Sequence, residues 1–228
     1  MLLYFVRHGY PDYTTDTLIP LGKFQAEETS KYLKDIPFDI IFSSELGRAV
    51  ETAECLASKQ KKEIIKLNWA REDLAWQTFS ALDEKTGHDS WIFFIDKYLK
   101  RLGELDDDPR WFDDPMFNGI DCEKGLIRMD NAVDKWLESL NIIHDRKTKS
   151  YYLKENEKAP DIIVLFAHGG MSLAFFSSIL DIPYSYFASH FEHSRLCGQS
   201  LIDFNMNTHK AKLVYYNQIN YDEKEFNK

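Results

Sequence analysis

Four short apolar runs, rich in β-branched and aromatic residues, place the main constraint on the fold. They lie at Leu2–Val6, Asp39–Ser43, Glu63–Asn68 and Asp161–Phe166. Patterns of helical period separate the first three runs, and strands that alternate with helices indicate parallel pairing through crossover helices. Two later runs, Gln199–Phe204 and Lys212–Asn217, flank a turn and predict an antiparallel pair at the sheet edge. We therefore predict an α/β fold with three layers, in which helices flank a mostly parallel, mixed central sheet.

The spacing of the runs also indicates an insertion. The 228 residues, 44% of them hydrophobic, suit a single domain over residues 1–228. The segment from about Arg71 to Pro160 is far too long for a simple crossover, and we expect a helical cap at about 71–160. Apolar residues at helical spacing predict two of its helices, over Trp91–Leu102 and Leu126–Leu140. The polar stretch Arg146–Lys158 is expected to be a mobile surface loop.

Composition limits the partners of the chain. The net charge of −9 disfavours nucleic acid and anionic membrane surfaces, because both need a basic footprint. A small phosphorylated substrate is compatible with it, since a local arginine cluster dominates at contact distance. The three cysteines form no CxxC pair, and the chain shows neither a signal-like start nor a long apolar run. We expect a cytoplasmic protein with reduced thiols, and the oligomeric state stays open.

Histidines and arginines follow three of the apolar runs. Arg7-His8-Gly9 ends the first run, Ser43-Ser44 ends the second just before Arg48, and Ala167-His168-Gly169 ends the fourth. Arginine pairs bidentately with phosphate and stays ionised, while a neutral imidazole is a nucleophile. Ser44 is a plausible N-cap, which would place Arg48 in the first turn of a helix whose positive end also favours an anion. Together these residues indicate a phosphate site.

The ordered motifs resemble the histidine phosphatase superfamily, also called the phosphoglycerate mutase-like family. The matching segments are Arg7-His8-Gly9, Pro20-Leu21-Gly22 with Gln25-Ala26-Glu27, Ser43-Ser44 with Leu46, Arg48-Ala49 and Glu51-Thr52-Ala53, and Ala167-His168-Gly169. The resemblance implies that His8 attacks a phosphate ester, while Arg7, Arg48 and His168 hold the phosphoryl oxygens. It implies no cofactor and no metal. Gly9 and Gly169 complete the expected substrate site, because backbone without Cβ allows close approach.

The family also implies a carboxylic acid, shortly after the third strand, that protonates the leaving oxygen. Glu72 is our candidate, with the adjacent Asp73 as its rival and a surface pair with Arg71 as the purely structural interpretation. The glycine-rich continuation common in the family is absent, and Ala75-Trp76-Gln77-Thr78 stands in its place.

Other candidates carry weaker signals. Glu51 either orients Arg48 or forms a helix-surface pair. His190 and His193 have helical spacing, but without cysteines or further carboxylates a metal site there is disfavoured, and these histidines or Arg195 are instead candidates to reach the substrate. Core packing accounts for most aromatic residues of the cap, whereas Trp111 and Phe112 are the better candidates for lining a pocket.

The function expected from this reading is a histidine-type acid phosphatase, a phosphoric monoester hydrolase. It would hydrolyse a small phosphorylated metabolite through a phosphohistidine on His8. Phosphoglycerate mutase-type phosphoryl transfer is one alternative, and Tyr10-Pro11-Asp12-Tyr13 after the first motif departs from the mutase pattern. A non-catalytic protein that binds phosphorylated ligands is the other. The substrate itself cannot be read from motifs that many activities share.

Overall fold

A computed structural model describes residues 1–226 of the chain. Within them, six strands form the central sheet in the order β12-β11-β1-β10-β4-β5. β1, β10, β4 and β5 run parallel, while β11 is antiparallel to β1 and β12 is antiparallel to β11. The strands are β1 (Leu2–Arg7), β4 (Ile40–Ser44), β5 (Ile64–Leu67), β10 (Ile162–Ala167), β11 (Gln199–Asn205) and β12 (Lys210–Gln218). The predicted mixed sheet is confirmed.

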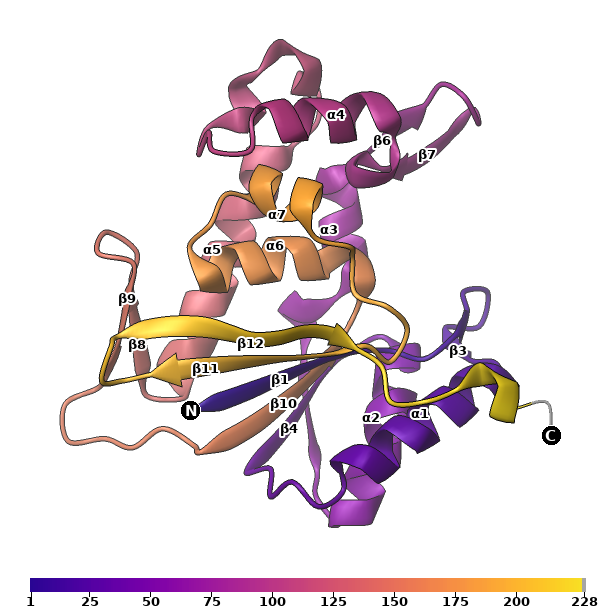
Figure 1. The fold of residues 1–228 in the computed structure, drawn as a ribbon, viewed down its shortest axis with the longest axis vertical. Helices are drawn as coiled ribbons and strands as arrows, with labels where there is room; N and C mark the ends of the chain where they lie inside the picture. Colours follow the sequence, from indigo (N-terminus) through magenta and orange to yellow (C-terminus); the bar gives the residue numbers. More distant parts are fainter. Residues whose placement is uncertain (227–228) are drawn as a thin grey trace.

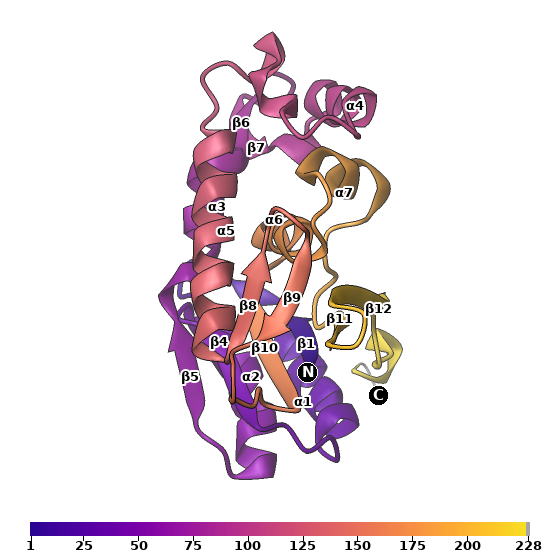
Figure 2. The same ribbon diagram turned by 90° about the vertical axis from the view of Figure 1, so that its left-hand side faces the viewer.

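Both faces of the sheet are apolar, because successive side chains of a strand point to opposite sides. On β1, Leu3 and Phe5 pack into one cluster with α5 and α6, whereas Val6 packs into the other with α1 and α2. β10 alternates in the same way. Figures 1 and 2 show α1 (Pro20–Leu33) and α2 (Gly47–Gln60) on one side of the sheet, and α5 (Cys122–Ser139) and α6 (Gly169–Leu180) on the other. The three layers result because helices cover both apolar faces of the sheet.

The segment between β5 and β10 contains more strand than the sequence suggests. It holds α3 (Glu72–Phe79), a hairpin of β6 (Ser80–Asp83) and β7 (His88–Trp91), α4 (Asp96–Glu104), α5, and a second hairpin of β8 (Ile142–Asp145) and β9 (Ser150–Leu153). Trp91 therefore ends a strand, and only the later part of the apolar pattern from Trp91 to Leu102 forms a helix. The first hairpin and α4 lie far from the sheet in Figure 1. The helix predicted over Leu126–Leu140 corresponds to α5.

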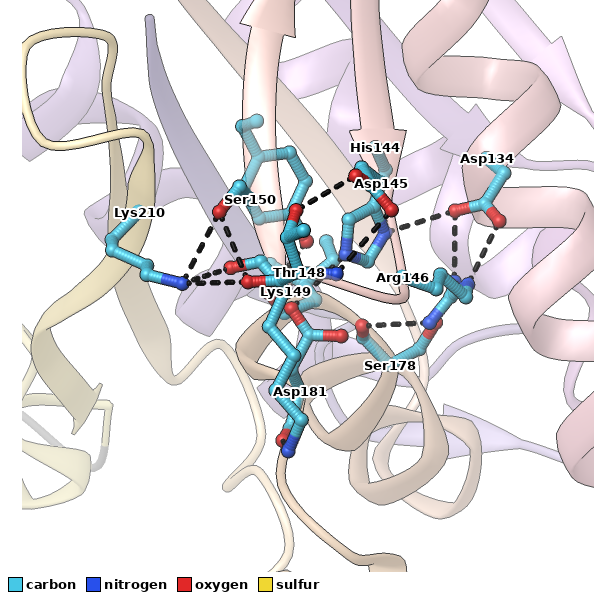
Figure 3. Close-up of polar contacts among 12 residues, drawn as sticks. Asp134, His144, Asp145, Arg146, Thr148, Lys149, Ser150, Ser178, Asp181 and Lys210 are labelled. Atoms are coloured by element: carbon cyan, nitrogen blue, oxygen red, sulfur yellow. Dashed lines mark hydrogen bonds and ion pairs between the residues drawn. The ribbon is translucent and has the colours of Figure 1, made fainter.

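The expectation of a mobile loop over Arg146–Lys158 is wrong for residues 146–153, which form the turn and second strand of the β8–β9 hairpin. Charged side chains fasten this hairpin to α5 and α6 (Figure 3). His144 lies between Asp134 and Asp181, each 3.0 Å from one ring nitrogen, and Arg146 lies 2.8 Å from Asp134. Arg146, the first residue of the stretch expected to be a solvated loop, instead bonds to α5 and α6.

α7 (Tyr184–His190) follows α6 and leads to β11. Two short strands, β2 (Pro11–Asp12) and β3 (Thr17–Leu18), pair in the loop after β1. Over residues 1–226, no helix is both long enough and apolar enough to cross a membrane.

Candidate active site

The ends of three neighbouring parallel strands bring the predicted residues together. β10 lies between β1 and β4, so the residues after β1 and β10 and the end of β4 meet at one sheet edge. The ring centroids of His8 and His168 are 5.1 Å apart, and both rings are fully buried. Arg48 reaches them from the first turn of α2. His8, His168 and Arg48 therefore occupy one site.

His8 is held in a defined tautomer. Its Nδ1 lies 2.7 Å from the carbonyl oxygen of Gly9 and donates to it, which leaves the lone pair on Nε2. Arg48 Nε donates to that Nε2 at 3.2 Å. Burial, with Arg7 and Arg48 adding to it, lowers the pKa of His8 well below 6.5. The imidazole is therefore neutral, as a nucleophile must be.

Gly9 cannot carry a side chain where it stands. A Cβ there would lie 2.4 Å from the carbonyl oxygen of Gly22. Its N–H donates to Thr52 Oγ1 at 3.1 Å, and its carbonyl accepts from His8. Both backbone groups are thus engaged by the protein, and they fix the orientation of the His8 ring.

Arg48 is surrounded by carboxylates. Its Nη2 donates to Glu72 Oε2 at 2.8 Å, and its Nη1 donates to Asp16. Asp16 also accepts from the N–H of Gly47, the first residue of α2, at 2.6 Å. Asp16 is therefore a site residue that the sequence did not reveal, because it lies in the turn between the first two motifs and belongs to neither.

The predicted N-cap role of Ser44 is wrong. Leu46 precedes α2 without a side-chain cap, and the Asp16 carboxylate satisfies the free N–H of Gly47 instead. The Ser44 hydroxyl lies 2.8 Å from Nε2 of His168. Ser44 therefore orients the second histidine.

Arg7 wraps around the start of α6. A Cβ on Gly169 would lie 2.8 Å from the guanidinium carbon of Arg7, so this close approach requires glycine. Arg7 Nη1 donates to the carbonyl of Ser194 at 2.7 Å. Among the described residues, the buried Arg7 Nε and His168 Nδ1 have no hydrogen-bond partner. Two polar atoms are thus free to bind a ligand.

His168 is also neutral. Burial lowers its pKa well below 6.5, and the nearby His8, Arg48 and Arg7 lower it further. The ring stands at the N-cap of α6, whose first N–H groups point toward the site.

The structure separates the two candidate acids. Glu72 begins α3, and its Oε1 accepts from the N–H of Gly170 at 2.8 Å, while its Oε2 lies 3.8 Å from His168 Nδ1. Asp73 instead accepts two hydrogen bonds from Arg71, at 3.0 and 2.9 Å, which hold its pKa below the usual range. Glu72 faces the histidines, and Asp73 is the residue that pairs with Arg71.

A cavity of about 560 Å³ opens in front of Arg7, Arg48, Glu72 and Gly170. Trp76, Trp91, Phe93, Phe94 and His193 also line it. A neighbouring cavity of about 850 Å³ shares Arg7, Tyr13 and His193, and Tyr10, Arg195 and Tyr221 belong to its walls. His193 and Arg195 thus reach the cavities, as the sequence suggested.

Neither Trp111 nor Phe112 lines the cavity in front of the histidines, and Trp111 lines a separate cavity of about 260 Å³ instead. Trp111 is buried in the core, where its ring packs against Phe117 and Tyr184. Glu51 does not contact Arg48 and accepts instead from the N–H of Leu18 at 2.8 Å. His190 stacks on Tyr186 and lies 3.5 Å from Asp106, away from both cavities.

The positive charge of Arg48 opposes metal binding at this site. Within residues 1–226, His8, Glu72 and His168 are the only group of three candidate ligands, with ligand atoms within 4.8 Å of one another. The Arg48 guanidinium contacts both His8 and Glu72. A cation at this point would meet a fixed positive charge, so the residues fit an anion better than a metal.

Known proteins share this architecture. The curated relative "Uncharacterized phosphatase PhoE" of Bacillus subtilis (strain 168) is 38% identical over 76 residues, 29% of this chain and 39% of the relative, so the match spans less than half of that protein. A mycobacterial glucosyl-3-phosphoglycerate phosphatase, solved with inorganic phosphate, is 21% identical with a TM-score of 0.61, covering 96% of this chain and 97% of that one. Phosphoserine phosphatase from Entamoeba histolytica, solved with 3-phosphoglyceric acid, is 20% identical with a TM-score of 0.59, covering 95% and 96%.

At these identities the two solved structures show a common fold. The family itself is shown by sequence. Because the sequence model of the histidine phosphatase superfamily (branch 1) matches residues 3–218, nearly the whole length, this chain belongs to that superfamily.

Proposed function

We propose that the protein is a phosphomonoesterase of the histidine acid phosphatase type. It hydrolyses a small phosphorylated metabolite through a phosphohistidine on Nε2 of His8. The observation that carries this proposal is the 2.7 Å hydrogen bond from His8 Nδ1 to the Gly9 carbonyl, which fixes a neutral imidazole with its nucleophilic nitrogen toward Arg48.

Substrate binding exchanges one anion for another. In the free protein the Glu72 carboxylate occupies Arg48 Nη2 and the N–H of Gly170. A phosphate dianion competes for these donors and would displace the Glu72 carboxyl from them. Arg7 Nε and the start of α6 supply further donors. Phosphate binding thus occupies the donors of Arg48 and Gly170 and leaves the Glu72 carboxyl free to act as the proposed acid.

His168 contributes a further donor. The Ser44 hydroxyl lies 2.8 Å from Nε2. We assign this hydroxyl as the donor, which places the proton of the neutral ring on Nδ1, facing Glu72. This N–H stabilises negative charge on a phosphoryl oxygen as it develops.

Two displacements complete the reaction. In the first, the bond from His8 Nε2 to phosphorus forms as the ester P–O bond breaks, and Glu72 gives its proton to the leaving oxygen. In the second, the Glu72 carboxylate takes a proton from water as the water oxygen attacks phosphorus and the P–N bond breaks. Inorganic phosphate leaves, and His8 is again neutral.

Radioactive labelling tests the intermediate. After brief exposure to 32P-labelled p-nitrophenyl phosphate and an alkaline quench, which preserves the P–N bond, the parent is expected to carry label on His8. His8→Ala should carry none, while His88→Ala, which removes an exposed histidine outside both cavities, should label like the parent. Equal hydrolysis by the parent and by His8→Ala would remove His8 from the mechanism.

The fate of the phosphoryl group distinguishes hydrolysis from transfer. We expect the label to appear as inorganic phosphate, because no second substrate hydroxyl is required by the two displacements. Recovery of the label on a second hydroxyl of a diol substrate would instead favour a mutase.

We also propose a cytoplasmic location. Cys55, Cys122 and Cys197 are free thiols, as is usual in a reducing compartment. Fractionation of cells that produce a tagged chain tests this, and recovery in an extracytoplasmic fraction would contradict it.

A further inference from the structure

The wall of the cavity beside Glu72 is a continuous run of rings. Trp76 meets Trp91 edge to face with centroids 4.9 Å apart, and Trp91 stacks on Phe93 at 5.4 Å. Phe94 lies 4.7 Å from Phe93 and 4.8 Å from His193. These residues come from α3, from the end of β7 and the turn that follows it, and from the loop after α7. Segments distant in sequence thus build one aromatic surface.

This surface adjoins the proposed phosphate site. The Trp91 ring covers Gly170 so closely that a Cβ on that glycine would lie 2.1 Å from the ring. The N–H of Gly170 is the one that bonds to Glu72. The aromatic surface therefore lies directly beside the backbone donor of the proposed phosphate site.

The acid determines which cavity receives the leaving group. Glu72 and Trp76 lie one helical turn apart on α3, so their side chains share a face of that helix. The group that takes its proton from Glu72 must lie beside that carboxyl, and both residues line the 560 Å³ cavity. The leaving alcohol thus departs along Trp76, Trp91 and Phe94 rather than into the neighbouring 850 Å³ cavity.

Two of the three arginines that line this cavity already have carboxylate partners. Arg71 is engaged twice by Asp73, and Arg48 is engaged by Asp16 and Glu72. Burial, together with Arg7, lowers the pKa of His193, so its ring is neutral at neutral pH. Among the described residues that line the cavity, only Arg7 remains as a cation without a carboxylate partner, and it serves the phosphoryl group. An acidic leaving group would find no counter-charge here.

We propose that the substrate is a phosphate monoester of an apolar, ring-bearing alcohol without a second acidic group, and that Trp76, Trp91 and Phe94 bind that alcohol. This inference rests on the proposed phosphatase function, since it uses the direction in which the leaving group departs. Phe94 is 52% exposed, which an apolar partner would cover.

Three esters with the same primary-alcohol attachment test the proposal: 2-phenylethyl, ethyl and 2-carboxyethyl phosphate. Their leaving groups differ little in intrinsic reactivity, so differences in kcat/KM report on binding. We expect kcat/KM for the phenyl ester to exceed that for the ethyl ester by about tenfold or more, and the carboxylate ester to be the poorest. Trp76→Ala should bring the phenyl-to-ethyl ratio close to one. Tyr32→Ala, which removes an exposed ring on α1 outside the cavity, should leave the ratio unchanged.

Calorimetric binding to His8→Ala separates this proposal from the reaction. We expect the variant to bind 2-phenylethyl phosphate about tenfold more tightly than ethyl phosphate. Equal affinities, or a preference for the carboxylate ester, would overturn the proposal even if the parent hydrolyses all three. Selective binding of the phenyl ester without hydrolysis by the parent would support the aromatic pocket and overturn the phosphatase function instead.

Discussion

Two clusters of histidine, arginine and carboxylate lie at opposite ends of helix α6, and the pKa values of their histidines are shifted in opposite directions. In the candidate active site, His8 and His168 share their surroundings with Arg7 and Arg48, and burial with these cations lowers both histidine pKa values. At the β8–β9 hairpin, burial alone would lower the pKa of His144, but hydrogen bonds to Asp134 and Asp181 outweigh it and raise the pKa. The same side-chain types thus favour the neutral form of histidine in one place and its charged form in the other.

The comparison shows how a functional site differs from a structural network of the same composition. Both nitrogens of His144 are bonded to protein carboxylates, and Arg146 bonds to Asp134 and Ser178 (Figure 3). In the candidate active site, by contrast, the buried Arg7 Nε and His168 Nδ1 lack partners among the described residues. Groups with hydrogen-bond partners in the protein stabilise the fold, whereas groups without such partners can bind the proposed phosphate.

The largest expected effect comes from replacing the proposed nucleophile, His8. His8→Gln should lower kcat/KM by about a thousandfold or more, because the nucleophile is lost. Its urea midpoint should stay close to that of the parent, since the site is organised for a ligand rather than for stability. Steady-state kinetics and urea unfolding measure the two quantities. A large fall in stability with little loss of rate would reverse the assignment of the two clusters.

Glu72→Gln should lower kcat by about a hundredfold for alkyl esters, because the leaving oxygen loses its proton donor. Asp73→Asn, the matched control on the adjacent residue, should change kcat by far less, since Asp73 pairs with Arg71. The difference should shrink for p-nitrophenyl phosphate, whose leaving group needs no proton. A larger effect at Asp73 would make Asp73 the acid.

His144→Ala should destabilise the fold by about 2 kcal/mol, since it leaves two carboxylates without their shared partner. Activity should be retained, because the hairpin does not line either cavity. Urea unfolding measures the effect, with the exposed His88→Ala expected to stay within about 0.5 kcal/mol of the parent. A His144→Ala protein as stable as the parent would show that the network contributes nothing net.

The smallest effect is a dependence on pH. A histidine whose pKa is raised on folding stabilises the protein fully below its unfolded pKa of 6.5, and this contribution disappears as the pH rises through the folded value. The stability difference between the parent and His144→Ala should therefore be largest below about pH 6.5 and narrow as the pH rises through the raised pKa of the folded state. Histidine 15N spectra at about pH 6 should show His144 charged and His8 and His168 neutral. A charged His8 would contradict the proposed nucleophile.

The sequence predicted the sheet and the grouping of the candidate catalytic residues because both depend on local signals. Apolar runs marked β1, β4, β5 and β10, and Arg7, His8 and His168 sit directly at strand ends. Asp16, Thr52 and Ser44 were missed in their actual roles because their partners lie 32, 43 and 124 residues away in sequence. Contacts between residues so far apart in sequence produce no periodic pattern in the sequence.

The hairpins, in contrast, share a sequence signal in their turns. The turn Asn205-Met206-Asn207-Thr208-His209 has the same form as Asp83-Glu84-Lys85-Thr86-Gly87 and Asp145-Arg146-Lys147-Thr148-Lys149. In all three, the first side chain accepts from the N–H two residues later, and the fifth residue has positive φ. The loop Asp12–Asp16 repeats this form and delivers Asp16 to Arg48. An Asx residue followed by threonine three positions later marks each turn.

Helix α3 joins two tasks that enzymes often divide between separate elements. Its first residue lies at the reacting centre, and a tryptophan one turn later lines the pocket that we assign to the departing alcohol. A small tilt of α3 would therefore alter both the proposed proton transfer from Glu72 and the proposed selectivity for the alcohol. Attempts to retarget the protein should accordingly redesign β7 and the turn at Ile92–Phe94, where rings can change while the carboxyl stays in position.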